Sequence, residues 1–381
     1  MAQVIGIVAG EASGDLLASH LMAAIRQVRP DVEFVGIGGP KMQSVGMRVL
    51  FPMEKLAVFG YVEVLRHYRE ISGIRRKLKK HFLANRPALF IGVDAPDFNF
   101  GLEHKLKRNG IPTIHYVSPS IWAWRGERIK MIRDAVTHML ALFPHEPEIY
   151  QHAGVPVSYV GHPFADMLPE YPDRAAMREM MRIPLKAKVF AFLPGSRQSE
   201  VRKLAALYIE TARVILQNMP DARFLVPLAS RETRTIFEQA IYDCKAEDMP
   251  FSLLFGHAQD AMTAADIVLV ASGTATLECA LLKRPMVITY RLNALTWRIM
   301  RRKSYLPYFG LPNILLGRFV VPELMQEDAT PRNLAQALLN LLNDQNAVAE
   351  LEVIFGELHK TLRQNTAQKA ADAVLSYLPS A

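Results

Sequence analysis

Cysteine is scarce in this sequence, and long uninterrupted apolar runs do not occur. The 381 residues include only two cysteines, Cys244 and Cys279, which are too few for a disulfide framework and favour a reducing compartment. No apolar stretch approaches the roughly 18 residues of a membrane-spanning helix, and the first residues predict a β-strand rather than a signal peptide. We therefore expect a cytoplasmic chain that is either soluble or bound to a membrane surface.

Metal-binding and dinucleotide-binding motifs are also missing. No D-x-D sequence occupies a suitable loop, and no group of Cys and His residues has the spacing of a zinc site. The glycine-containing turn near the N-terminus is not G-x-G-x-x-G, and no acidic residue ends the next predicted strand to hold a ribose. We expect neither a metal ion nor a nicotinamide or flavin cofactor.

Acidic residues are fewer than basic ones, by 37 to 45, which gives a net charge of +8. This excess favours anionic partners without choosing among nucleic acid, anionic lipid and a phosphorylated substrate. Seven of the basic residues lie within residues 66–80, beside one glutamate. Apolar residues recur there at helical spacing, at Phe59, Val62, Leu65, Tyr68, Ile71, Ile74 and Leu78. The pattern predicts a basic amphipathic helix, which either docks on an anionic membrane or packs on the core with its basic face in solvent.

Short apolar runs alternate with helical patterns along most of the chain, as expected for parallel strands covered on both faces. Two series of such runs are separated by a stretch rich in proline and charge, residues 166–188. We predict two Rossmann-like α/β domains facing each other across a cleft. The predicted parts are residues 1–168, residues 169–345, and C-terminal helices at 346–381 that pack back on an N-terminal domain. The predicted strands lie at 4–10, 34–39, 88–96, 113–119, 138–144, 157–163, 189–196, 223–230, 251–256, 266–273 and 285–290.

Ligands of open α/β sheets bind at the carboxyl ends of strands, so the turns that follow strands are candidate sites. In the first unusual turn, residues 10–15, glycines permit a tight turn and Ser13 or Asp15 can cap the next helix; a turn without a ligand is the plainer interpretation. In the second, Asp94 and Asp97 flank a proline and suit a general base facing a cleft. Helix capping explains the same spacing.

Two further turns suit phosphate groups. Gly195, Ser196 and Arg197 precede a predicted helix whose N-terminus favours an anion, although Glu200 could instead cap Ser196 or pair with Arg197. Residues 272–275 form a second turn of this kind, and Glu278 follows within an apolar helix. This glutamate needs either ribose hydroxyls or a buried ion-pair partner. Together the turns indicate a nucleoside diphosphate, opposite which a carboxylate base would allow glycosyl transfer.

Five segments carry a family resemblance, in the order VAGEASGD, GVDAPDFN, IHYVSPSIWAWR, LPGSRQSEV and LVASGTATLE. The sequence resembles the lipid-A-disaccharide synthases of Gram-negative bacteria, which are inverting glycosyltransferases with the GT-B fold. The resemblance implies that UDP-2,3-diacylglucosamine reacts with 2,3-diacylglucosamine 1-phosphate without a metal. The products are the β-1′,6-linked disaccharide 1-phosphate and UDP.

The same resemblance implies roles for individual residues. Asp94 becomes the general base for the 6-hydroxyl of the acceptor, and Arg197 stabilises the leaving diphosphate together with helix dipoles. Glu278 falls on the ribose and Asn313 near the donor. The remaining donor residues are Gly195, Ser196, Ser272, Gly273, Thr274 and Ala275, and those on the acceptor side are Glu11, Ser13 and Asp97.

The implied partners are the two diacylated sugars and the cytoplasmic face of the inner membrane, contacted through residues 59–80; nucleic acid is not expected. The sequence leaves open whether the chain forms a homodimer. Two alternatives remain: another UDP-sugar enzyme of this fold, such as an N-acetylglucosaminyltransferase or a 2-epimerase, and a non-catalytic peripheral protein that binds UDP or lipid. We expect structural roles for His115 and His138, with His162 a secondary candidate near a donor phosphate.

Overall fold

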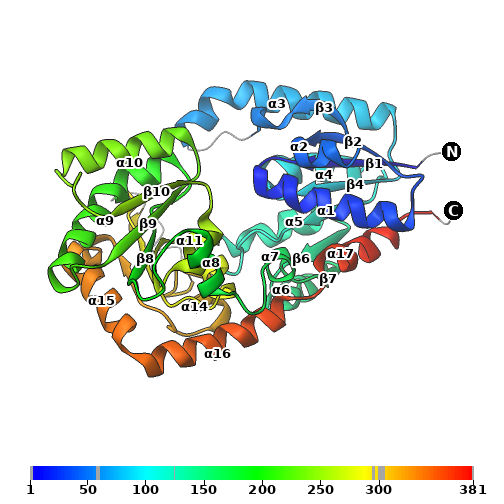
Figure 1. The fold of residues 1–381 in the computed structure, drawn as a ribbon. Helices are drawn as coiled ribbons and strands as arrows, with labels where there is room; N and C mark the ends of the chain where they lie inside the picture. The colour runs from blue at the N-terminus through cyan, green and yellow to red at the C-terminus, as the bar shows by residue number, and fades with distance from the viewer. Residues whose placement is uncertain (1–2, 57–60, 124, 294–296, 299–304, 380–381) are drawn as a thin grey trace. The chain divides into compact units, whose positions relative to one another are not determined.

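The computed structural model describes residues 3–56, 61–123, 125–293, 297–298 and 305–379, with the backbone alone at residue 54 and residues 61–68. It divides into two compact units (Figure 1). The first unit comprises residues 1–166 together with 361–381, and the second comprises residues 167–360. Each unit is described separately below.

The first unit contains a parallel sheet in the strand order β3-β2-β1-β4-β5-β6-β7. Its inner strands β1, β4 and β5 are buried along nearly their whole length, because helices cover both faces of a parallel sheet. The strands are β1 (Val4–Ala9), β2 (Glu33–Gly38), β3 (Arg48–Pro52), β4 (Leu89–Val93), β5 (Thr113–Tyr116), β6 (His138–Ala141) and β7 (Val157–Tyr159).

The helices of this unit follow the strands in alternation, as a doubly wound sheet requires. The α-helices are α1 (Ala12–Val28), α2 (Pro40–Ser44), α3 (Tyr61–Ala84), α4 (Pro96–Lys107), α5 (Ile129–Ala135), α6 (Glu146–His152), α7 (Pro163–Met167) and α17 (Thr366–Leu375). Two short 3₁₀ helices are η1 (Met53–Lys55) and η2 (Gly126–Arg128).

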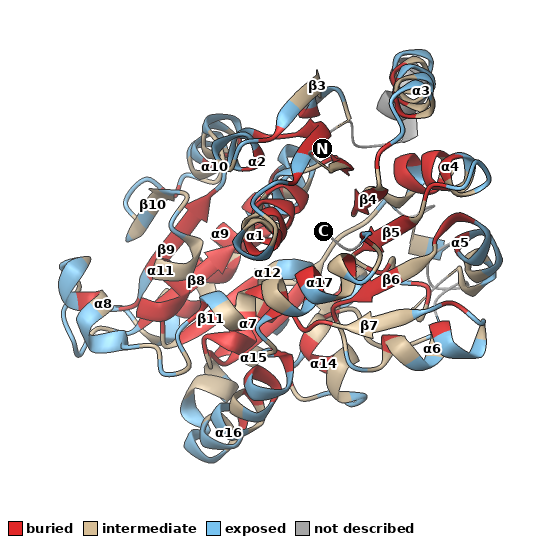
Figure 2. Cartoon of the chain, turned by 90° about the vertical axis from the view of Figure 1, so that its right-hand side faces the viewer, coloured by how far each residue is buried: buried red, intermediate tan, exposed pale blue. Residues whose placement is uncertain are grey.

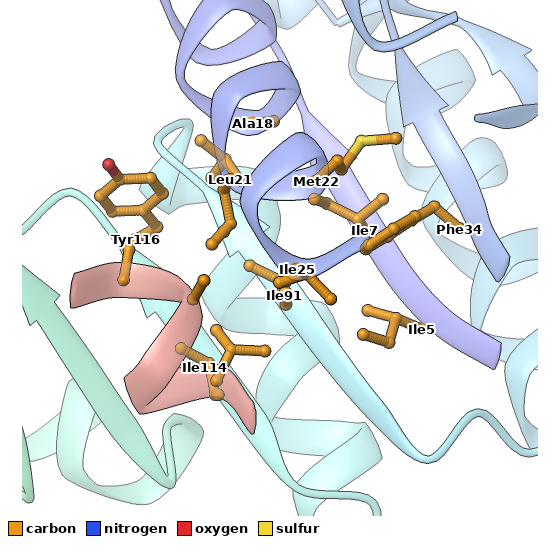
Figure 3. Packing of buried hydrophobic residues seen from close by; sticks show 14 of the residues in the cluster. Ile5, Ile7, Ala18, Leu21, Met22, Ile25, Phe34, Ile91, Ile114 and Tyr116 are labelled. Carbon is orange, nitrogen blue, oxygen red and sulfur yellow. The ribbon is translucent and has the colours of Figure 1, made fainter. Parts of the chain in front are cut away.

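The main core of the first unit lies between α1, α17 and one face of the sheet. Figure 3 shows Leu21, Met22 and Ile25 of α1 directed toward the strand residues Ile7 and Ile91, all of them fully buried. The C-terminal helix α17 packs along α1 and adds its own apolar residues to this cluster. The C-terminal segment of the chain is therefore an integral layer of the first unit.

The second unit contains a parallel sheet in the order β10-β9-β8-β11-β12-β13. Figure 2 shows the central strands β8 and β11 as buried. The strands are β8 (Val189–Leu193), β9 (Arg223–Leu228), β10 (Phe251–Phe255), β11 (Ile267–Ala271), β12 (Met286–Tyr290) and β13 (Glu323–Met325). The helices are α8 (Arg174–Met180), α9 (Gln198–Asn218), α10 (Arg231–Asp243), α11 (Ala258–Ala264), α12 (Thr274–Leu281), α14 (Leu311–Leu316), η3 (Gln326–Asp328), α15 (Pro331–Asn343) and α16 (Gln345–Leu362).

Asp266 joins the start of this unit to its sheet. Arg178 of α8 is buried and donates to the Asp266 carboxylate at 2.8 Å, to the Ala264 carbonyl at 2.8 Å and to the Leu185 carbonyl at 2.7 Å. The same carboxylate accepts from the Val189 amide at 2.8 Å. Because a buried guanidinium needs partners for its donors, these bonds fix the entry of the chain into β8.

The eleven predicted apolar runs all form strands, and the predicted α/β class with two Rossmann-like sheets is confirmed. Sequence analysis missed only β3 and β13 among the strands that the structure describes. Both are edge strands whose residues are mostly half-exposed or exposed. Burial therefore does not force a continuous apolar run on them, and the strand signal is weak.

The predicted basic amphipathic helix falls largely on α3. Phe59 lies outside the described residues, and so do the side chains of Val62, Leu65 and Tyr68. In the described half, Ile74 and Leu78 are buried in a core cluster that also contains residues of β1 and α4. Arg76, Lys77 and Lys80 are exposed. From Ile74 onward the apolar face packs on the protein core. Among the described residues no helix is both long and apolar enough to cross a membrane.

Candidate functional site

The second unit contains a cavity of about 380 Å³ at the carboxyl ends of its central strands. It is lined by residues that follow β8, β9, β10 and β11, together with Tyr290 at the end of β12. Eight of the nine donor residues proposed from the sequence line it, namely Gly195, Ser196, Arg197, Ser272, Gly273, Thr274, Ala275 and Glu278. The sheet order β8-β11 explains this, because neighbouring parallel strands place their following turns at one edge.

The turn between β8 and α9 is organised by Glu200. Its carboxylate accepts from the amides of Ser196 and Arg197, at 3.2 and 3.3 Å, and from the Tyr290 hydroxyl at 2.8 Å. Gly195 has φ +112°, and a Cβ there would lie 2.5 Å from the Glu200 carboxylate. Glycine is therefore required, both for the backbone conformation and for the approach of the carboxylate.

The two turns that suit phosphate groups, residues 195–197 and 272–275, differ in the backbone N–H donors that they offer. The amides of Ser196 and Arg197 already donate to Glu200, so both sequence interpretations of Glu200, as a cap and as a partner of Arg197, are present together. By contrast, the amides of Gly273, Thr274 and Ala275 have no acceptor among the residues that the structure describes. These groups open α12, whose N-terminus carries the positive end of the helix dipole. The start of α12 is thus the better prepared anion site.

Arg197 adds a positive charge to the same cavity. Its guanidinium is 53% exposed and lies 3.5 Å from the Glu200 carboxylate. A guanidinium can bind two phosphate oxygens at once. The cavity therefore combines a half-exposed cation with backbone amides.

Glu278 lies one turn inside α12 and faces this cavity. Burial raises the pKa of its carboxyl group, and a hydrogen bond from Gln259 opposes the increase. Gln259 Nε2 on α11 donates to Glu278 Oε2 at 3.1 Å. No ion pair of Glu278 occurs among the described residues, so its carboxylate is supported by an amide rather than by a cation.

Asn313 is the donor residue that the structure does not bring into the cavity. It is fully buried in α14, where its Nδ2 donates to the Val321 carbonyl and to Glu323, and its Oδ1 accepts from the amides of Val320 and Val321. Two donors and two acceptors are all that an asparagine side chain offers. Asn313 therefore holds the chain that leads into β13.

In the first unit, Asp94 follows β4 in an uncommon backbone conformation. Asp94 and Ala95 are consecutive non-glycine residues in the left-handed region, with φ +51° and +44°. The Asp94 amide donates to the Tyr116 carbonyl at 2.8 Å. The side chain of Asp94 is half-buried, whereas that of Asp97 is 79% exposed and pairs with Arg128. Strain of this kind persists only where the surroundings impose it, and it is concentrated at functional sites.

Asn99 stabilises this turn through a hydrogen bond to its backbone. Its Nδ2 donates to the Asp94 carbonyl at 2.8 Å from one turn inside α4. On the same helix, Glu103 accepts from His115 Nδ1 at 2.8 Å, and both side chains are completely buried. Burial raises the pKa of Glu103, and the contact with His115 opposes this. Sequence analysis missed Asn99 and Glu103, which lie four residues apart in α4 and so share one face of this helix.

The turn that follows β1 lies beside the Asp94 turn, because β1 and β4 are neighbours. A Cβ on Gly10 would come within 2.8 Å of the Ala95 side chain. Glu11 and Ser13, proposed on the acceptor side, therefore belong to the same sheet edge as Asp94. Asp15 does not cap α1; its buried carboxylate accepts from the amides of Gly39, Lys41 and Met42, at the start of α2.

Other histidines in this unit have structural partners. His138 bonds to the Ser158 and Tyr377 hydroxyls, which ties β6 to its neighbour β7 and to the C-terminal segment. His162 is buried and accepts from the Phe164 amide, and burial lowers its pKa to about 4. Glu146, a buried acid beside Trp122, was not anticipated from the sequence. Among the described residues no group of three or more His, Cys, Asp or Glu side chains could hold a metal ion.

Comparisons with known proteins give a consistent picture. A family model described as lipid-A-disaccharide synthetase matches residues 5–376. The lipid-A-disaccharide synthase of Methylobacillus flagellatus is 62% identical over 374 residues, covering 98% of this chain and 99% of that protein. That of Aromatoleum aromaticum is also 62% identical, over 99% of this chain and 97% of that protein.

Solved structures with similar folds are more distant in sequence. The UDP-GlcNAc 2-epimerase of Neisseria meningitidis, bound to UDP-GlcNAc, is 11% identical with a TM-score of 0.64, covering 98% of each chain. MurG of Acinetobacter baumannii is 14% identical with a TM-score of 0.59, covering 99% of this chain and 100% of its own. At these identities the likeness establishes the fold, which is GT-B, and leaves the substrate to other evidence.

Proposed function

The chain belongs to the lipid-A-disaccharide synthetase family and is a glycosyltransferase, and from this premise we propose the reaction that it catalyses. The 2,3-diacylglucosaminyl group of UDP-2,3-diacylglucosamine is transferred to the 6-hydroxyl of 2,3-diacylglucosamine 1-phosphate. The products are the β-1′,6-linked disaccharide 1-phosphate and UDP. The observation that carries the proposal is the cavity in which two phosphate-type turns and Glu278 meet.

The nucleotide of the donor binds in this cavity. The unengaged amides at the start of α12 receive the diphosphate, and Arg197 approaches it from the turn after β8. Glu278 accepts hydrogen bonds from the ribose hydroxyls, which gives its buried carboxylate donors besides Gln259. Gly195 and Ser196 shape the wall of the cavity, because Glu200 already occupies the Ser196 amide.

Asp94 is the general base of the transfer. Its carboxylate takes the proton of the acceptor 6-hydroxyl while that oxygen attacks the anomeric carbon of the donor. The bond from the anomeric carbon to the diphosphate breaks as the new bond forms on the opposite face, and its electron pair leaves with UDP, so the configuration inverts. Arg197 and the dipole of α12 stabilise the charge that develops on the leaving diphosphate. Asp97 is less suited to this role, since it is exposed and paired with Arg128.

Peripheral contact with the cytoplasmic face of the inner membrane completes the proposal, because both substrates carry acyl chains. Exposed basic residues of α3, among them Arg76, Lys77 and Lys80, support attraction to anionic lipid. Since Ile74 and Leu78 pack on the core, the basic face rather than this part of the apolar face would meet the membrane. Binding to anionic vesicles should then weaken steeply with added salt.

The test is UDP release from UDP-2,3-diacylglucosamine in detergent, with and without acceptor, and with and without EDTA. Acceptor-dependent release that survives EDTA is expected. Asp94→Asn should lose roughly 100-fold or more of kcat while keeping its affinity for UDP, and Asp97→Asn should lose far less. Arg197→Ala should weaken UDP binding itself.

Other results would point to the alternatives. Activity on UDP-N-acetylglucosamine but not on the diacylated donor would transfer the function to another UDP-sugar enzyme of the same fold. Binding of UDP without any turnover, unaffected by Asp94→Asn, would indicate a non-catalytic binding protein.

A further inference from the structure

Glu146 is a buried carboxylate that the transfer chemistry does not use. It begins α6, directly after β6, and is 1% exposed. Its Oε2 accepts from the amides of Leu142 and Phe143, each at 3.0 Å, and its Oε1 accepts from Trp122 Nε1 at 3.2 Å. One carboxylate therefore joins the segment that follows β5 to the segment that follows β6.

A second contact from the same helix strengthens this connection. Tyr150 lies one turn after Glu146, and its hydroxyl is 2.7 Å from the Ser118 hydroxyl. Residues four positions apart share one helix face, so α6 contacts both ends of the segment 118–122. The contact between Ser118 and Tyr150 is buried and that between Glu146 and Trp122 is partly buried, so removing one partner would leave the other polar group poorly hydrated.

The segment held by Glu146 begins next to the Asp94 turn. The Tyr116 carbonyl accepts from the Asp94 amide at 2.8 Å, and the next residue, Val117, has φ +81°. A β-branched residue in the left-handed region is strained and needs its surroundings to impose the conformation. The bonds of Ser118 and Trp122 to α6 restrain the residues that follow Val117.

The electrostatic surroundings of Glu146 make this contact dependent on its charge. The bonding partners, Trp122 and the amides of the two residues that follow β6, all donate hydrogen bonds, which suits an ionised carboxylate. Burial opposes ionisation and raises the pKa of Glu146 to about 7. The other titratable groups around it are His145, Tyr150, Tyr159, His162 and Asp166. Burial lowers the pKa of both histidines, and that of His162 falls to about 4.

We propose that Glu146 is a positioning residue for the acceptor: by holding Trp122 and the amides after β6 together, it fixes residues 117–122 beside the Asp94 turn as a wall of the acceptor site. The proposal rests on the proposed function, because it assigns this edge of the first unit to the acceptor. A residue of this kind acts through Trp122 and does not contact the reacting atoms.

The experiment compares Glu146→Gln with Glu148→Gln in the full-length protein. Glu148 is a matched control, since it lies on the same helix turn and is exposed. Loss of hydrogen bonds to a buried charge should raise the KM for the acceptor about tenfold or more in Glu146→Gln. The KM for the donor should stay within about twofold, and Glu148→Gln should match the wild type in both.

Fluorescence provides a readout that needs no activity. The signal of Trp122 is the difference between each protein and its Trp122→Phe derivative, followed from about pH 5 to about pH 9. The wild type and Glu148→Gln should show a transition with a midpoint near pH 7, and Glu146→Gln should show none. A transition that persists in Glu146→Gln would assign the titration to another group, such as His145 at 4.9 Å from Trp122, and would overturn the proposal.

The remaining outcomes also decide the question. Equal increases of both KM values in Glu146→Gln, or a lower melting temperature alone, would reduce Glu146 to a structural residue. Should Glu146→Gln not fold, Trp122→Phe replaces it and should show the same acceptor-selective increase. If the wild type is inactive on these lipids, the proposed function fails, and the proposal about the acceptor fails with it; a fluorescence transition would then establish only the contact between Glu146 and Trp122.

Discussion

Replacing Gly195 by alanine tests the donor cavity without removing any charged group. The residue has φ +112°, which lies outside the left-handed region that other residues tolerate. Its new Cβ would lie 2.5 Å from the Glu200 carboxylate, which accepts from the Ser196 and Arg197 amides and from Tyr290. The substitution therefore strains the turn and displaces Glu200 in one step.

The size of the effect follows from these two contributions. Backbone strain of this kind costs about 1–3 kcal/mol, and each displaced hydrogen bond to a carboxylate adds roughly 1.5 kcal/mol or more. The turn can relax when no nucleotide is bound, and it loses that relief when UDP binds. If the relief amounts to about 2 kcal/mol, the affinity for UDP falls roughly 30-fold. The expected direction is weaker UDP binding, because the carboxylate moves within a cavity that must accept a diphosphate.

Gly317 provides the matched control. It belongs to the same unit, has φ +65°, and a Cβ there would meet nothing within 4 Å. It does not line the cavity. Gly317→Ala should lower stability by about 1 kcal/mol through backbone strain and leave UDP affinity as it is in the wild type.

Isothermal titration with UDP measures both variants, and their melting temperatures report the change in stability. The reasoning is refuted if Gly195→Ala binds UDP as tightly as the wild type, since the turn would then have no part in the donor site. An equal loss of affinity in Gly317→Ala would show that general destabilisation, and not the displaced Glu200, is responsible.

Two further predictions concern the first unit. Asn99→Leu, similar in size but unable to donate to the Asp94 carbonyl, should lower kcat about tenfold with UDP affinity unchanged; steady-state kinetics with unaltered kcat would contradict the assigned support of Asp94. For Glu146, whose pKa rises from 4.5 to about 7 on burial, the folded state holds the proton more tightly than the unfolded chain. Its stabilising contribution is complete below about pH 4.5 and is lost as the pH rises through about 7, roughly 3 kcal/mol in all. The melting temperature of the wild type relative to Glu146→Gln should therefore fall between about pH 5 and about pH 8, and a constant difference would exclude the shifted pKa.

Much of the fold can be predicted from local sequence patterns. A strand covered on both faces is mostly apolar, so the buried strands of both units were predicted from short apolar runs. The edge strands β3 and β13 were not predicted, because half-exposed residues need not be apolar. The turns after β4, β8 and β11 were also recognisable, since glycine, proline and small polar residues there mark the ends of parallel strands.

The partners of individual polar groups were beyond sequence reasoning. Glu200 was expected either to cap its helix or to pair with Arg197; the structure shows both, together with a bond to Tyr290, which lies 90 residues away. Asp15 was a candidate cap for its own helix, but its carboxylate instead accepts hydrogen bonds from backbone amides at the start of α2. These contacts depend on which strands become neighbours, and that order is a property of the whole sheet.

The sequence by itself therefore determined the architecture, the strand ends at which chemistry is possible, and the family. The tertiary structure decided which polar groups remain available there. It leaves the amides that open α12 without an acceptor among the described residues, uses every hydrogen-bonding group of the Asn313 side chain internally, and buries Glu146 against Trp122. The physical reason is that buried polar groups must be satisfied by whatever lies beside them, and only the folded chain determines those neighbours.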